Sequence, residues 1–185
     1  LARETGRPTL IVPGHARGFV DPVTGDARLR RVLIPVAKAP EPGTAIGLAA
    51  WLANIIGGDD VRFTLLHVGN DLDVLAIDAP QRPGWEWTLI QRDGDVAECI
   101  LRAEQEMQPD LVVMTTQGHN GFLDALRGST TERVLRHLHC PMLTAVASGA
   151  RGSEVVLREY RTAAVSIARS RCHSSRSIAP PEVLG

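Results

Sequence analysis

The stretch Asp110-Leu-Val-Val-Met-Thr-Thr-Gln-Gly-His-Asn-Gly121, with its continuation Gly128-Ser-Thr-Thr-Glu132, decides the fold of this chain. The apolar residues that follow Asp110 predict a buried strand, and residues 129–138 predict a helix with a polar cap. Glycines in the loop between them let backbone N–H groups approach an anion, and the helix dipole favours negative charge at the helix start. The stretch therefore predicts a site for phosphate or a nucleotide.

Strands and helices alternate on both sides of this stretch. Such alternation predicts an α/β fold, a doubly wound five-stranded parallel sheet of the Rossmann-like kind with right-handed crossovers. Ligands of such sheets bind at the carboxyl ends of the strands, where the strand order reverses, which here means Val36-Ala37 and Met114-Thr115. The predicted strands are 31–36, 61–68, 85–90, 111–115 and 141–146, and the predicted helices are 41–56, 94–108 and 130–138.

Composition narrows the class of protein. With 185 residues and a net charge of −1, the chain suits one α/β domain with some extra chain, and the balance of charge argues against a nucleic-acid binder. The cysteines, Cys99, Cys140 and Cys172, are odd in number and far apart, which favours a reducing cytosol over a disulfide framework or a zinc cluster. No apolar run is long enough for a membrane helix. We expect a cytoplasmic protein.

The chain divides into three parts. Residues 1–29 form an N-terminal arm and linker, 30–147 the domain, and 148–185 an Arg/Ser-rich tail that is partly helical, over 154–169, or disordered. Residues 1–12 echo residues 134–145, since both place Leu and Arg before an X-Pro and an apolar run. The echo is either a coincidence between helix–strand junctions or the end of a preceding, truncated copy of the domain. In either case we expect the apolar residues 9–12 to pack on the domain or a neighbouring chain.

Several segments in order resemble the universal stress protein family. Its ATP-binding members carry a glycine, two residues, a second glycine, nine residues and then Gly-Ser or Gly-Thr. Gly118 and Gly128-Ser129 match the second glycine and the end of this motif. The strands Val-Leu-Ile-Pro-Val, ending at Val36, and Leu-Leu-His-Val, ending at Val68, and the Cys140-Pro141 junction are also similar, so the resemblance covers about 30–147. It implies a stress-response protein that binds ATP with Mg²⁺ and forms a homodimer through the edge of strand 141–146, without nucleic acid or membrane partners.

The resemblance also implies which residues line the nucleotide. Two departures weaken the site: Ala37 replaces the Asp that usually ends the first strand, and Thr115 replaces the first glycine of the motif. The implied set is Pro35, Val36, Ala37, Val68, Met114, Thr115, Gly118, His119, Gly121, Gly128, Ser129 and Thr130.

Other interpretations of the same residues stay open. The glycines and Ser129 are also ordinary turn and capping residues, and His67 is better explained as a satisfied histidine at a strand end. The same fold could serve as a dimerising interaction module without a nucleotide, or as an enzyme of the wider adenine nucleotide α-hydrolase-like group. An enzyme would need a base or a metal ligand, and we find no nucleophile–base pair, so we predict no catalytic residue, no resident metal and no enzymatic activity.

Overall fold

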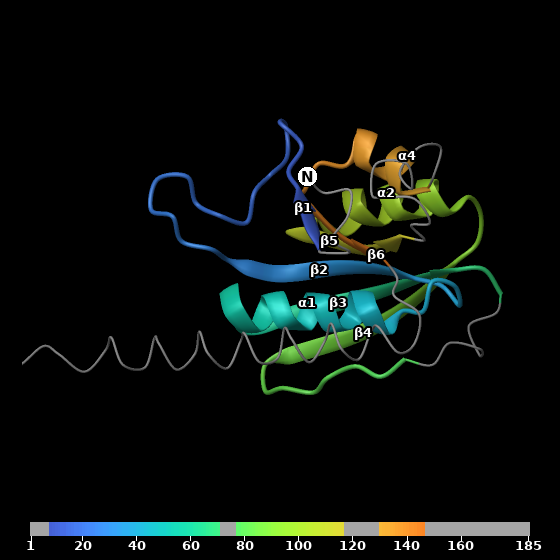
Figure 1. Ribbon diagram of the computed structural model, residues 1–185, viewed down its shortest axis with the longest axis horizontal. Helices are drawn as coiled ribbons and strands as arrows, with labels where there is room; N and C mark the ends of the chain where they lie inside the picture. Colours follow the sequence, from blue (N-terminus) through green and yellow to red (C-terminus); the bar gives the residue numbers. More distant parts are fainter. Residues whose placement is uncertain (1–7, 71–76, 117–129, 147–185) are drawn as a thin grey trace, which may run out of the picture.

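A computed structural model of the chain describes residues 8–70, 77–116 and 130–146. Its centre is a six-stranded sheet with the strand order β1-β6-β5-β2-β3-β4 (Figure 1). The strands are β1 (Thr9–Ile11), β2 (Leu29–Val36), β3 (Gly57–Val68), β4 (Trp85–Arg92), β5 (Leu111–Thr116) and β6 (Met142–Val146), and the helices are α1 (Gly43–Ile56), α2 (Val96–Met107) and α4 (Thr130–His137).

The five strands β2 to β6 are mutually parallel, as the alternating pattern predicts. Strands β2, β3, β5 and β6 contain buried residues, whereas the residues of the edge strand β4 are half-buried or exposed. Strand β5 is apolar along most of its length because helices cover both faces of a parallel sheet. Strand order reverses between β5 and β2, so this is the topological switch point of the sheet. The predicted α/β doubly wound fold is confirmed.

Two apolar layers hold the helices on opposite faces of the sheet. On one face, α1 packs its alanine-rich side on a cluster that includes Phe63 and Val113. On the other face, α2 and α4 cover a second cluster that includes Ile100, Val112 and Val134. In Figure 1, α1 lies between β2 and β4 in the lower half of the view, and the α2–α4 pair lies near the top. Consecutive residues of β5 therefore contribute to different layers, as the alternation of a strand requires.

The number of strands differs from the prediction. The sheet has six strands, because Thr9–Ile11 pairs antiparallel with β6, with Leu10 opposite Leu143. An edge strand exposes a row of unpaired N–H and C=O groups, and a short apolar segment satisfies them while covering its own side chains. The expectation that residues 9–12 pack on the domain is confirmed for the residues of β1. The edge of β6 that the sequence assigned to a homodimer is thus occupied by the chain itself.

The N-terminal arm, residues 8–28, is also anchored by polar contacts beyond β1. Glu104 on α2 is 1% exposed and forms an ion pair with Arg17 at 3.0 Å, and His139 lies 3.4 Å from its second carboxylate oxygen. The backbone N–H of Arg17 donates to the carbonyl of His139 at 2.7 Å, and the His15 ring packs edge-on against the His139 ring. A buried carboxylate needs such partners. They fix the arm against the ends of α2 and α4.

Some boundaries lie elsewhere than predicted. Helix α1 ends before Gly57-Gly58 as expected, but β3 begins at once at Gly57 instead of at residue 61. Residues 77–84 contain neither helix nor strand, in agreement with the predicted loop, while residues 71–76 and the predicted tail helix over 154–169 lie outside the described residues. Within the described part of the chain, none of the helices is long and apolar enough to cross a membrane.

Candidate functional site

The carboxyl ends of β2 and β5 part from each other at the switch point. Their ladder contains the pairs Val32 with Leu111 and Leu33 with Val112. The flanking ladders continue, since β2 stays paired with β3 as far as Val36 and β5 with β6 as far as Thr116. Among the residues described, the ends of β2 and β5 therefore have no ladder partner in each other. This is the place where a doubly wound sheet accepts a ligand.

On the β2 side, the strand ends are fixed by His67. This residue pairs with Val36 across the β2–β3 ladder and is 2% exposed. Its Nδ1 lies 3.2 Å from the carbonyl oxygen of Val36, so the ring can donate to that carbonyl when Nδ1 carries the proton. The interpretation of His67 as a satisfied histidine at a strand end agrees with this contact. It positions the end of β2 and stays within the core.

On the β5 side, the last residue of the strand carries a polar atom without a partner. Thr116 is 5% exposed, and within the described part of the chain its Oγ1 accepts and donates no hydrogen bond. Its side chain lies on the same face of β5 as that of Met114, which packs in the layer under α2 and α4. Buried hydroxyl groups in proteins are nearly always paired, so Thr116 needs a polar partner that the described residues do not supply.

The predicted site residues that the structure describes lie at this edge. Val36 and Met114 are buried, Pro35, Val68, Thr115 and Thr130 are half-buried, and Ala37 is exposed just beyond β2. The rest of the predicted set lies outside the described residues: Gly118, His119, Gly121, Gly128 and Ser129. The structure thus brings the strand-end part of the set to one edge and leaves the loop part undescribed.

Arg133, which follows the loop in the sequence, pairs with a carboxylate at the start of α2. Its guanidinium donates to both oxygens of Asp95 at 2.9 and 3.0 Å. Asp95 is the N-cap of α2, where its carboxylate also accepts from the backbone N–H of Glu98 at 3.0 Å. The Arg133 guanidinium, followed by this backbone hydrogen bond, holds the pKa of Asp95 below its usual range. Arg133 therefore links α4 to α2 and is not available as an unpaired cation for phosphate.

Among the described residues of β2 and β5, the chemistry available at this edge is neutral hydrogen bonding. Thr115 and Thr116 supply hydroxyl groups, and the ends of β2 and β5 supply backbone groups. The cationic residue that follows the end of β2 in the sequence is Lys38, which is exposed and adjacent to Ala37. No cluster of three or more histidine, cysteine or acidic residues that could hold a metal occurs among the residues described. The sequence analysis missed Thr116, since a threonine ending an apolar strand is common and only its burial without a partner makes it notable.

Comparison with known proteins agrees with the fold. Residues 76–145 match the model of the universal stress protein family. A universal stress protein of Methanocaldococcus jannaschii is 39% identical over 51 residues, which cover 28% of this chain and 30% of that protein. This part of the chain is therefore similar to universal stress proteins. The family resemblance inferred from the glycine spacing is thereby confirmed.

A solved universal stress protein shares the fold at low sequence identity. A crystal structure of a universal stress protein from Archaeoglobus fulgidus superimposes with a TM-score of 0.56 at 17% identity, over 80% of this chain and 52% of that one. A universal stress protein crystallised in complex with cAMP gives a TM-score of 0.49 at 12% identity, over 65% of this chain and 98% of that one. This chain spans about half the length of the Archaeoglobus protein and matches less than a third of the Methanocaldococcus protein.

Proposed function

We propose that this chain binds an adenine nucleotide at the carboxyl ends of β2 and β5 and acts in a stress response without catalysing a reaction. The observation that carries the proposal is the buried, unpaired Oγ1 of Thr116 at the parting of the two strands. A bound nucleotide would give this hydroxyl a partner. The glycines of the loop that follows, from Gly118 to Gly128, would give its phosphates backbone N–H groups.

The finer form of the proposal is ATP with Mg²⁺. In that form the phosphates lie on the loop residues, and the base and ribose lie against the end of β2. Ala37 offers no carboxylate acceptor there, and one missing hydrogen bond costs roughly 1 kcal/mol. We therefore expect modest affinity and poor discrimination between adenine and guanine nucleotides. The cytoplasm is the proposed location, in keeping with the three cysteines and no disulfide motif.

The expected homodimer through the β6 edge has to be modified, because part of this edge is already paired. The strand β1 already pairs with Met142–Thr144. A second chain could use that edge only by displacing β1 or by extending the sheet beyond it. Leu10 is 46% exposed on β1, which leaves apolar surface at this outer edge. The alternative is an interaction module that binds no nucleotide. The binding experiment below distinguishes this alternative from the proposal.

The test is isothermal titration calorimetry of the protein with AMP, cAMP and Mg·ATP, using the variant Thr116→Val. Valine keeps the shape of threonine and removes the hydroxyl. Because Oγ1 makes no hydrogen bond in the free protein, the variant should unfold at an unchanged or higher temperature. It should bind nucleotide roughly tenfold more weakly, since a hydrogen bond of about 1.4 kcal/mol corresponds to that factor.

Thr88→Val is the matched control. Thr88 lies exposed in the middle of β4, away from the switch point, and should leave binding unchanged. Ala37→Asp is the converse change and should strengthen binding of adenine over guanine nucleotides. The proposal is wrong if the unmodified chain shows no binding of any of these nucleotides at millimolar concentration. Equal binding by the Thr116→Val variant would remove Thr116 from the site and leave the location without its main support.

A further inference from the structure

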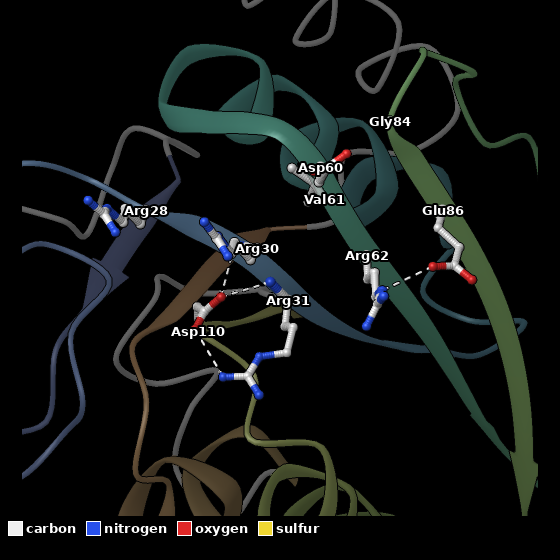
Figure 2. A pocket seen from close by; sticks show the side chains of 9 residues that line it. All are labelled: Arg28, Arg30, Arg31, Asp60, Val61, Arg62, Gly84, Glu86 and Asp110. Atoms are coloured by element: carbon white, nitrogen blue, oxygen red, sulfur yellow. Dashed lines mark hydrogen bonds and ion pairs between the residues drawn. The ribbon is translucent and has the colours of Figure 1, made fainter.

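A second candidate site lies at the opposite end of the sheet, where the parallel strands begin. It is a pocket of about 590 Å³. Figure 2 shows side chains from the starts of β2, β3 and β4 and from the residue before β5 around it. The lining residues are Arg28, Arg30, Arg31, Asp60, Val61, Arg62, Gly84, Glu86 and Asp110. A volume of this size is typical of sites for small molecules, which range from about 300 to 1,000 Å³.

An irregularity in the β2–β3 ladder opens this pocket. Leu29 pairs with Gly57, and the next pair joins Arg31 to Arg62. Two steps along β2 therefore correspond to five steps along β3. The extra residues of β3, which include Asp60, interrupt the ladder at its start. The regular pairing resumes with Val32 opposite Phe63. Bulges of this kind re-aim side chains and are frequent next to functional sites.

The pocket combines four arginines with three carboxylates, which leaves it one net positive charge. Two of the three carboxylates, those of Asp110 and Glu86, already accept hydrogen bonds. One oxygen of Asp110 accepts from the backbone N–H groups of Arg30 and Arg31 at 2.9 and 2.8 Å, and the other lies 3.6 Å from the Arg31 guanidinium. Glu86 accepts from Arg62 at 3.1 Å. Asp110 therefore fixes the backbone of β2 and does little to neutralise the side chains of Arg28 and Arg30.

Two guanidinium groups remain without a direct partner. Within the described residues, the side chains of Arg28 and Arg30 form no hydrogen bond or ion pair, although Arg28 experiences the charge of Asp21. Arg28 directly precedes β2 and Arg30 is the second residue of β2, and both line the pocket. Arg62 joins them from β3, and its ion pair with Glu86 is weak because the two side chains are 76% and 65% exposed. Arg62 can therefore turn from Glu86 to a ligand.

We propose that this pocket binds a small phosphate-bearing molecule, held by Arg28, Arg30 and Arg62. A phosphate group carries several oxygens in a tetrahedral arrangement and takes paired N–H donors from guanidinium groups on different sides. Arginines from two strands supply such donors, whereas a carboxylate offers two oxygens in one plane. Asp60, without a partner among the described residues, faces the same pocket and can accept a hydrogen bond from a hydroxyl group on the body of the ligand. The site is independent of the proposed nucleotide site, because the two lie at opposite ends of the strands.

The experiment is a titration of the unmodified chain with inorganic pyrophosphate, followed by calorimetry and by NMR signals of the arginine Nε–H groups. We expect the signals of Arg28, Arg30 and Arg62 to shift on saturation. The double variant Arg28→Gln, Arg30→Gln should bind at least about tenfold more weakly, since each guanidinium contributes charge-assisted hydrogen bonds. Higher salt should weaken binding to the unmodified chain, because exposed charges are screened.

The matched control is the double variant Arg102→Gln, Arg136→Gln, which loses the same charge from exposed positions on α2 and α4. It should bind pyrophosphate as the unmodified chain does, and so should Thr116→Val, which reports on the nucleotide site. The proposal is overturned if the control weakens binding as much as the Arg28, Arg30 double variant, or if that double variant binds normally. Citrate is the carboxylate probe, and tighter binding of citrate than of pyrophosphate would overturn the assignment to phosphate.

Discussion

The two ends of this sheet offer ligands different chemistry although the same strands build both. At the carboxyl ends of β2 and β5, the described side chains are apolar or neutral, and Thr116 contributes one unpaired hydroxyl. At the amino ends, guanidinium and carboxylate groups surround an open pocket. Recognition at the first end must rest on shape and hydrogen bonds to the backbone, whereas recognition at the second rests on charge. The two proposed sites should therefore differ in their response to salt, and each should be removable without the other.

The structural reason is how each ladder ends. At the carboxyl end, β2 and β5 part while their outer neighbours stay paired, so the gap in the ladder is bordered by regular strands. At the amino end, an irregular stretch of β3 interrupts the ladder with β2, and polar residues fill the place of regular pairing. The topology of a doubly wound sheet imposes the first opening. The second arises from residues 57–61 at the start of β3.

The largest effect should follow a change in the core that both ends share. Phe63 is fully buried on β3, its ring stacks on Trp87 at 4.0 Å, and Trp85 packs edge-on at 5.1 Å. Replacing it by alanine should lower the free energy of unfolding by about 3–5 kcal/mol, because it removes apolar contact and leaves a cavity. Chemical denaturation measures this loss. Leu89→Ala on the neighbouring β4, where the side chain is 40% exposed, is the control and should cost less than about 1 kcal/mol.

A smaller effect, restricted to the amino end, should follow Asp110→Ala. The carboxylate holds the backbone N–H groups of Arg30 and Arg31, which ties the start of β2 to the start of β5. Its side chain is 21% exposed, so water can replace part of this bonding, and we expect a loss of about 1–2 kcal/mol. Pyrophosphate binding should weaken while nucleotide binding persists. Equal loss of both ligands would show that the two ends are coupled and would break the comparison.

The sequence predicted the frame of the fold because that frame depends on local patterns. The apolar runs at 31–36 and 111–115 identify buried strands. Their alternation with helices indicates a parallel sheet and leaves few possible strand orders for it. The position of residues 9–12 was also predictable in part, since four apolar residues in an arm must be covered. Their antiparallel pairing with Met142–Thr144 was not predicted, because it depends on which groups at the sheet edge need partners.

The second pocket could not be predicted, because it arises from contacts between distant residues. Gly57-Gly58 indicates the end of a helix, and nothing local indicates that the strand has already begun there. The pairing of Arg133 with Asp95 joins residues 38 positions apart and removes a cation that the sequence places beside the loop. Thr116 matters only through burial without a partner, which is a property of the packed structure. The glycine spacing of the loop, in contrast, is local and carries the resemblance to universal stress proteins.

The next effect concerns how the unfolding temperature depends on pH under acid conditions. Arg133 lowers the pKa of Asp95, and a hydrogen bond from Arg92 lowers the pKa of Glu106. A carboxylate whose pKa is lower in the folded state stabilises the fold above its unfolded pKa of roughly 4, and this contribution is lost as the pH falls through the folded value. Unfolding temperatures of the double variant Asp95→Asn, Glu106→Gln should therefore fall less steeply below pH 5 than those of the unmodified chain.

The effect should be small, because both carboxylates are partly exposed and screened by solvent. Glu41→Gln is the control: Glu41 is exposed and has no ion pair among the described residues, so its replacement should leave the acid profile unchanged. Parallel acid profiles for the double variant and the unmodified chain would contradict the assigned role of these ion pairs.

The smallest expected effect concerns Cys140, just before β6. We expect its thiol not to be alkylated in the folded chain. The thiol is fully buried, and burial, with a further contribution from the charge of Glu104, raises its pKa to about 12. Only the thiolate attacks alkylating reagents, so at pH 9 the folded chain should expose almost no reactive Cys140. In a Cys172→Ser background, mass spectrometry after treatment with iodoacetamide should find Cys140 unmodified in the folded state and modified in denaturant. Rapid modification of the folded chain would mean that the start of β6 opens readily, and the arm that covers this end through Arg17 and His15 would then not hold it closed.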